Sequence, residues 1–228
     1  AMPAIEELRA SIERATLVAP FRHLTRGFFA GRDAELNMLA AYADGPDIGA
    51  DGLASSPVLV YGPGGMGKSA LLAHFILAHS ERDTTKPGSW CPFVYLDFDR
   101  PELDARDLGG VLLAIARQIA PQVPGVQAQS AELVERWTAS QRSARPEPTG
   151  ATKTRRTRLA VRTSAPDIDE LVAKLGVILV KVHEFIPAPL VLVIDTLEEV
   201  QYATPDAVVP LAEMVMKLRR MVPSLRPV

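Results

Sequence analysis

Residues 58–72 read VLVYGPGGMGKSALL, and this stretch decides the fold. The apolar run at 58–61 predicts a short buried strand, and the pattern from Lys68 to Ser80 predicts a helix. The loop between them fits G-x-x-x-x-G-K-[ST] at every fixed position. A strand, a glycine-rich loop and a helix in this order predict a phosphate-binding loop.

The chemistry of this loop follows from its residue types. Glycines let the backbone approach a phosphate closely, and successive N–H groups with the positive end of the helix form an anion site. We expect Lys68 to reach the outer phosphates and the Ser69 hydroxyl to ligate Mg²⁺. The predicted ligand is therefore a nucleoside triphosphate with Mg²⁺. Its predicted binding residues in the loop are Gly62, Pro63, Gly64, Gly65, Met66, Gly67, Lys68, Ser69 and Ala70.

A second apolar stretch, LVLVIDTLEEV at 190–200, ends in acidic residues. A buried strand over 190–194 places Asp195 at its carboxyl end, where parallel sheets bind ligands. We predict that Asp195 holds Mg²⁺ through water. Glu198 and Glu199 follow, and either could polarise an attacking water as the general base. The alternative is that both are solvated glutamates at a helix start, and the residues leave this choice open.

The remaining chain alternates helical and strand patterns. These predict helices over 4–16 (ended by Pro20), from Asp33 onward, over 102–120, over 168–186 and over 206–221, with a further strand over 93–98. Such alternation predicts an α/β fold of three layers, with a mainly parallel sheet flanked by helices. Residues 140–166, rich in Ser, Thr, Pro and Arg, predict a flexible insertion. The expected organisation is a helical extension at 1–24 and a nucleotide-binding domain at 25–228 that carries this insertion.

Composition narrows the choice of partners. The net charge of −2 over 228 residues gives no broad attraction to nucleic acid or acidic membrane. The basic cluster at 153–158 lacks interleaved aromatic residues for base stacking, so a solvated loop is favoured. No apolar run is long enough to span a membrane. The lone Cys91 fits a reducing cytoplasm, which is the expected location.

Three motifs together resemble one family. Phe29–Leu36 (FAGRDAEL) is similar to an F-x-G-R-x-x-E-L box, and Gly-Pro-Gly-Gly-x-Gly-Lys-Ser is a common form of the family's phosphate loop. Asp195–Glu199 is similar to the NACHT acidic pattern, although Thr196 stands where glycine is usual. The chain thus resembles the signal-transduction ATPases with numerous domains, which include the NACHT and NB-ARC switch ATPases and have an AAA-type nucleotide-binding domain. The resemblance implies that Phe29 and Arg32 lie near the base.

The resemblance also implies a function. By this resemblance, the chain is expected to be an ATP-binding and ATP-hydrolysing molecular switch domain of a larger signalling or defence-type protein, with ATP or ADP and Mg²⁺ as cofactors. The implied partners are other copies of the chain or other domains of a longer protein. A nucleotide-binding module without turnover and a small-molecule phosphotransferase remain open alternatives. No N-K-x-D-type motif for guanine recognition follows the acidic strand, which argues against a GTPase.

The same family arranges its strands in the order 5-1-4-3-2. Here the chain stops at Arg226–Val228, where the fourth strand should begin. We therefore expect a fold that is incomplete at its C-terminus, as in a fragment of a longer protein, with weak or absent hydrolysis. An empty slot between two buried strands would leave backbone groups unpaired, so we expect direct pairing of the two strands, or another segment or another molecule in the gap.

Overall fold

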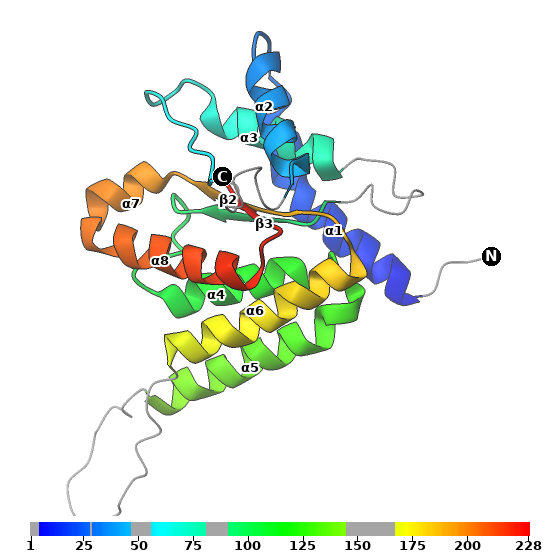
Figure 1. The fold of residues 1–228 in the computed structure, drawn as a ribbon, viewed down its shortest axis with the longest axis vertical. Helices are drawn as coiled ribbons and strands as arrows, with labels where there is room; N and C mark the ends of the chain where they lie inside the picture. The colour runs from blue at the N-terminus through cyan, green and yellow to red at the C-terminus, as the bar shows by residue number, and fades with distance from the viewer. Residues whose placement is uncertain (1–4, 28, 47–55, 81–90, 145–166) are drawn as a thin grey trace, which may run out of the picture.

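The computed structural model describes residues 5–27, 29–46, 56–80, 91–144 and 167–228. Its strands form a parallel sheet in the order β1-β2-β3, which confirms the predicted parallel α/β arrangement (Figure 1). The strands are β1 (Phe93–Asp97), β2 (Leu190–Asp195) and β3 (Leu225–Pro227). In register, Asp97 lies opposite Asp195, so both carboxylates stand at the same end of the sheet.

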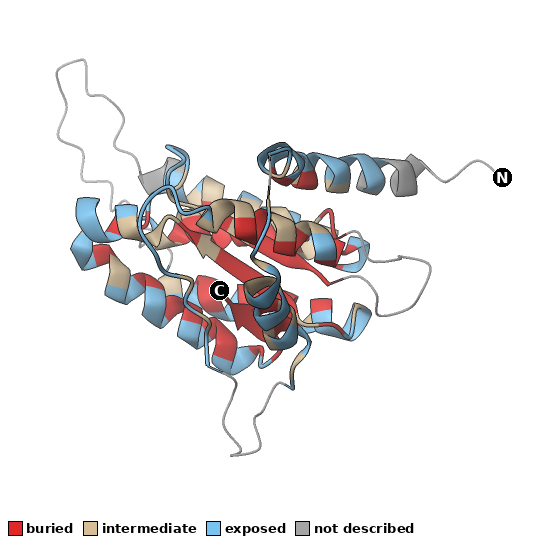
Figure 2. Ribbon diagram, turned by 90° about the horizontal axis from the view of Figure 1, so that it is seen from above, coloured by how far each residue is buried: buried red, intermediate tan, exposed pale blue. Residues whose placement is uncertain are grey.

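Helices cover both faces of the sheet. One layer holds α1 (Ile5–Leu24), α2 (Asp33–Asp44) and α3 (Lys68–Ser80). The other holds α4 (Leu108–Ile119), the 3-10 turn η1 (Pro124–Val126), α5 (Gln127–Ala144), α6 (Ile168–Phe185), α7 (Leu197–Ala203) and α8 (Pro205–Met221). Alternate strand residues face opposite layers, because Val94 and Leu96 join the core under α4–α8 while Phe93 joins the core under α1–α3. Figure 2 shows the buried strands between the two layers.

The expectation that the fourth strand is missing is wrong. Residues Leu225–Pro227 form β3, which pairs with β2 in parallel register. Val228 continues the pairing, since its N–H donates to the Leu192 carbonyl at 2.8 Å and its carbonyl accepts from the Ile194 N–H at 2.8 Å. The last residues of the chain therefore occupy the slot between β2 and the segment that leads into the phosphate loop.

The predicted strand at 58–61 is not part of the sheet ladder. Its backbone contact with the sheet, among the described residues, is the Val58 N–H, which donates to the Pro227 carbonyl at 3.2 Å. Proline has no N–H to return such a bond, which explains why no regular ladder forms beside it. The side chains still alternate as in a strand. Val58 and Val60 pack on the core, whereas Leu59 and Tyr61 are exposed.

Two predicted helix boundaries differ from the structure. Helix α1 continues through Pro20 to Leu24, although proline removes one helical hydrogen bond. Burial of Phe21, which follows the proline, supports this last turn. Helix α4 begins at Leu108 rather than at 102, because the Asp107 carboxylate accepts a hydrogen bond from the Gly110 N–H and caps the helix there.

Helix α5 was not expected from the sequence. It runs over Gln127–Ala144, and it buries Leu133 and Trp137 against the core. Trp137 fits closely against α4, since a Cβ added at Gly109 would lie only 1.9 Å from the indole ring. The first residues of the predicted insertion are therefore helical. The rest of it, including the basic cluster at 153–158, lies outside the described residues.

The open edge of β1 is closed by two glutamines of α4 and the turn after it. The side-chain amide of Gln118 accepts from the Tyr95 N–H and donates to the Tyr95 carbonyl, both at 2.9 Å. Gln122 does the same for Phe93, at 3.1 Å and 2.6 Å. Each amide thus replaces the donor and the acceptor that a neighbouring strand would supply, so this edge of β1 is satisfied within the chain.

The predicted helices at 168–186 and 206–221 are confirmed as α6 and α8. Asp167 caps α6 by accepting a hydrogen bond from the Asp169 N–H at 3.0 Å. Across the described part of the chain, no helix combines the length and apolar character needed to cross a bilayer.

Candidate functional site

The glycine loop joins the extended segment 58–61 to α3. Gly65 and Gly67 have φ angles of 77° and 79°, which side chains disfavour, so both positions require glycine. The Leu71 N–H donates to the Gly67 carbonyl at 2.9 Å and starts the helix. N–H groups of the first turn of α3 therefore point toward the loop. A Cβ built at Gly62 or Gly64 meets nothing within 4 Å, so neither position is crowded by other atoms of the protein.

Lys68 lies across this loop. Its ammonium group donates to the Gly62 carbonyl at 2.9 Å, and its Nζ is 3.0 Å from Oε1 of Glu198. The backbone N–H of Glu198 and the Lys68 ammonium group both hold the pKa of the Glu198 carboxyl below its usual value. Two residues that the sequence assigned to one site are thus in direct contact.

The two candidate glutamates differ in position. Glu198 points to Lys68, whereas Glu199 is exposed and its N–H donates to the Thr196 carbonyl at 2.9 Å. Both lie in the first turn of α7, where a carboxylate is favoured by the helix dipole. The geometry places Glu198, and not Glu199, beside the phosphate loop. Its role as the base remains a prediction.

Asp195 ends β2 and is only 4% exposed. Its Oδ1 accepts from the Thr196 N–H at 2.9 Å, and its Oδ2 accepts from the Tyr95 hydroxyl at 2.5 Å. Thr196 itself has a φ angle of 58°, in the left-handed region that a β-branched residue rarely adopts. This backbone conformation gives a physical reason for glycine at that position in related motifs. The Thr196 hydroxyl lies 2.7 Å from the Asp195 carbonyl.

Asp97 and Asp99 form the turn after β1. The Asp97 carboxylate accepts from the Asp99 N–H at 3.1 Å and pairs with the Arg100 guanidinium at 3.1 Å. Its Oδ1 also lies 3.3 Å from the Thr196 hydroxyl. These contacts describe a turn at the end of a strand.

A cavity of about 240 Å³ lies between α2 and the phosphate loop. Its lining is mostly apolar, with Met38 and Leu39 from α2 facing Val58 and Val60, and Lys68 at one side. Pockets that enclose whole small-molecule ligands measure roughly 300–1,000 Å³, so this cavity has the size of part of a nucleotide. Its place next to the loop matches the position expected for the base.

The two residues predicted to lie near the base are separated. Arg32 lines the cavity and joins α2 to the loop, since its guanidinium donates to Glu35 Oε1 at 2.8 Å and to the Met66 carbonyl at 3.1 Å. Phe29 lies outside the lining and stacks on the His74 ring of α3, with centroids 3.9 Å apart. A direct contact of Phe29 with a base remains a prediction.

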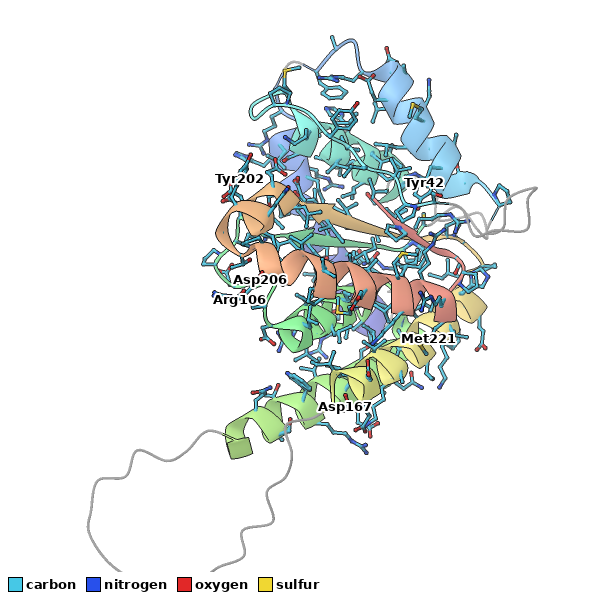
Figure 3. All side chains as sticks on the ribbon, turned by 60° about the vertical axis from the view of Figure 1, so that its left-hand side comes forward. Tyr42, Arg106, Asp167, Tyr202, Asp206 and Met221 are labelled. Carbon is cyan, nitrogen blue, oxygen red and sulfur yellow. The ribbon has the colours of Figure 1, made fainter. Side chains whose placement is uncertain are left out.

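Several residues that shape the site carried no signal in the sequence. Tyr42 of α2, labelled in Figure 3, donates to the Pro227 carbonyl at 3.0 Å, and the buried Arg226 donates to the Gly45 carbonyl at 3.0 Å. These bonds fix the far end of α2 to β3, and hence one wall of the cavity. Tyr95 beside Asp195 is a third such residue. Their partners lie on distant segments, so no local motif could have revealed them.

The residues present fit Mg²⁺. The Ser69 hydroxyl and the Asp195 carboxylate are hard oxygen donors, one from each of the two sequence motifs. Within the described residues, no group of three or more His, Cys, Asp or Glu side chains forms a metal cage. Mg²⁺ bound with a nucleotide commonly uses one or two protein ligands together with phosphates and water.

The fold and the loop define an α/β domain of the P-loop nucleotide-binding type. The chain belongs to the AAA ATPase domain family, whose family model matches residues 29–222. It is also similar to a protein of Lysobacter enzymogenes named "Probable ATPase FE772_23070", with 28% identity over 131 residues. That match covers 57% of this chain and 11% of the relative. No solved structure gives a significant match.

Proposed function

We propose that this chain is the nucleotide-binding domain of an ATP-dependent molecular switch in a larger signalling or defence-type protein. The observation that supports it most directly is the contact of Lys68 with Glu198 at the mouth of the phosphate loop. Membership of the AAA ATPase domain family supports nucleotide binding and ATP hydrolysis. The narrower assignment, to the signal-transduction ATPases with numerous domains, rests on the Phe29–Leu36 box and the Asp195–Glu199 pattern.

In the proposed mechanism the chain's own groups act in sequence. Backbone N–H groups of the loop and the Lys68 ammonium group bind the phosphates, while α2 and Val58–Val60 enclose the base. Lys68 turns from Glu198 to the outer phosphates, which frees the Glu198 carboxylate to accept a proton from an attacking water. Ser69 and Asp195 would hold Mg²⁺, which supplies neutralisation of the phosphate charge. The domain acts as a switch when other domains, or further copies of the chain, respond to nucleotide binding and to the movement of Lys68 away from Glu198.

The test is a binding titration of ATP, ADP and GTP with and without Mg²⁺. We expect ATP and ADP to bind at least about tenfold more tightly than GTP, equivalent to about 1.4 kcal/mol. Lys68→Ala should weaken ATP binding strongly, while Lys217→Ala, which removes an exposed lysine of α8 paired with Asp169, should not. A preference for GTP would contradict the proposal.

Turnover separates this function from a nucleotide-binding module that has lost hydrolysis. Phosphate release should be measured for the chain and for the longest natural protein that contains it. Release that is lost in Glu198→Gln but retained in Glu199→Gln is expected for the switch ATPase. ATP binding without release in both proteins would favour the module without turnover.

A further inference from the structure

Tyr95 stands beside the predicted magnesium residue. It belongs to β1, and its hydroxyl donates to Oδ2 of Asp195 on β2 at 2.5 Å. In the parallel register Tyr95 lies opposite Val193, two residues before Asp195, so both side chains project from the same face of the sheet. That face carries α3, the helix that follows the phosphate loop.

The Tyr95 ring is held from several directions. Phe21 of α1 packs edge-to-face on it, with centroids 4.9 Å apart and planes at 86°. The backbone on either side of the ring is paired with β2 and with the Gln118 amide. Phe21 is only 3% exposed, and it contacts the Phe93 ring as well, at 5.7 Å. Phe21 of α1 therefore supports the ring, while β2 and Gln118 of α4 hold the backbone that carries it.

The Asp195 carboxylate is fixed in turn. One oxygen accepts from the Thr196 N–H and the other from the Tyr95 hydroxyl. An ordinary phenol is protonated at neutral pH, so the Tyr95 hydroxyl acts as the donor in this hydrogen bond. A carboxylate has about four acceptor positions, so two donors leave lone pairs for a further ligand while setting the carboxylate plane.

We propose that Tyr95 is a positioning residue for Asp195 in binding Mg²⁺, and that α1 supports this role through Phe21. The inference rests on the proposed function, in which Asp195 holds Mg²⁺ through water. A buried carboxylate with a single donor could rotate, whereas one held on both oxygens keeps its remaining lone pairs in one direction, toward the water that Mg²⁺ would carry. Hydrogen-bond partners of direct metal ligands change metal affinity by about 10–100-fold, and we expect the lower end of this range for a carboxylate that acts through water.

The test measures ADP affinity by calorimetry over a range of Mg²⁺ concentrations and in EDTA. Tyr95→Phe keeps the ring against Phe21 and removes the hydroxyl. We expect unchanged affinity in EDTA, and a Mg²⁺ concentration for the half-maximal effect that is raised about tenfold or more. Tyr202→Phe is the matched control, since that phenol on α7 is 83% exposed (Figure 3), and it should behave as wild type.

A second variant tests the contribution of α1. Phe21→Leu keeps an apolar side chain but removes the edge-to-face contact with Tyr95. We expect a smaller shift in the same direction, of about two- to fivefold, again with unchanged affinity in EDTA. This variant also gives an independent result if Tyr95→Phe does not fold.

The outcomes distinguish this inference from the function on which it rests. If Mg²⁺ has no effect on ADP affinity in wild type, and Asp195→Asn changes nothing, the assignment of Asp195 fails. If Asp195→Asn reduces the Mg²⁺ effect while Tyr95→Phe matches wild type, only the role of Tyr95 is overturned. Equal loss of affinity in EDTA and in Mg²⁺ for Tyr95→Phe would mean a purely structural role and would also overturn it.

Discussion

Nζ of Lys68 and Oε1 of Glu198 are 3.0 Å apart, so the lysine of the phosphate loop is paired with a carboxylate from the other motif. The lysine side chain is 17% exposed and the glutamate side chain 44% exposed. Any phosphate that binds Lys68 must compete with this carboxylate. The ion pair therefore links the occupancy of the loop to the position of the proposed base.

Removing the charge of Glu198 should tighten nucleotide binding while stopping hydrolysis. Glu198→Gln frees Lys68 and takes a negative charge away from the phosphates. Exposed ion pairs contribute about 0.2–1 kcal/mol, so ATP should bind up to about fivefold more tightly in EDTA. Calorimetry of ATP binding to wild type, Glu198→Gln and Glu199→Gln provides the measurement. Weaker binding by Glu198→Gln than by Glu199→Gln would contradict the competition.

The ion pair between Lys68 and Glu198 should make the stability of the folded protein fall at acidic pH. The pKa of Glu198 is lowered from 4.5 in the folded protein, so the contribution of the ion pair to stability is present above that value. It is lost as the pH falls through the lowered pKa. The difference in melting temperature between wild type and Glu198→Gln should be constant from about pH 8 to pH 5 and should shrink below about pH 4. Because Glu198 is 44% exposed, the difference corresponds to less than about 1 kcal/mol. If the difference in melting temperature grows as the pH falls, the predicted pH dependence is contradicted.

The left-handed backbone at Thr196 predicts that glycine is tolerated there better than valine. Left-handed angles cost an L-residue about 1–2 kcal/mol, which Thr196→Gly relieves at the expense of the hydroxyl contacts and of about 0.5–1 kcal/mol of chain entropy. The free energy of unfolding should change little in Thr196→Gly. Thr196→Val keeps the strain and loses the hydroxyl, so it should be destabilised by about 1–2 kcal/mol. Urea denaturation measures the free energy of unfolding of both variants. If Thr196→Gly is less stable than Thr196→Val, the left-handed backbone at Thr196 is contradicted.

Replacing Gln122, one of the two glutamines that close the edge of β1, should strongly lower the free energy of unfolding. Gln122 is fully buried, and its amide satisfies the N–H and the carbonyl of Phe93. Gln122→Met preserves the length of the side chain but leaves both groups unpaired, at a loss of about 1–3 kcal/mol of unfolding free energy for each. Gln141→Met, on the exposed face of α5, is the matched control and should be neutral. Equal melting curves for the two variants would show that water or another group satisfies the edge.

The sequence predicted most accurately those features that lie within a short stretch of chain. The strand over 190–194 and the helix after the glycine loop each depend on neighbouring residues, and both are confirmed. Helix α5 was missed because its apolar residues Leu133 and Trp137 are spaced among many polar ones. The prediction of a strand at 58–61 was wrong because hydrogen bonding between strands depends on the neighbouring strand, and the neighbour here contains Pro227, which has no N–H.

By itself the sequence determined which residues make up the proposed site. The glycines, Lys68, Ser69, Asp195 and the two glutamates follow from residue types at fixed spacings, since local backbone geometry sets what such motifs can do. The tertiary structure alone decided how they meet. It placed Glu198 rather than Glu199 on Lys68, and it set Tyr95 against Asp195 across 100 residues. It also put Pro227 beside Val58. These contacts join distant segments, so they depend on the packing of sheet and helices rather than on any local pattern.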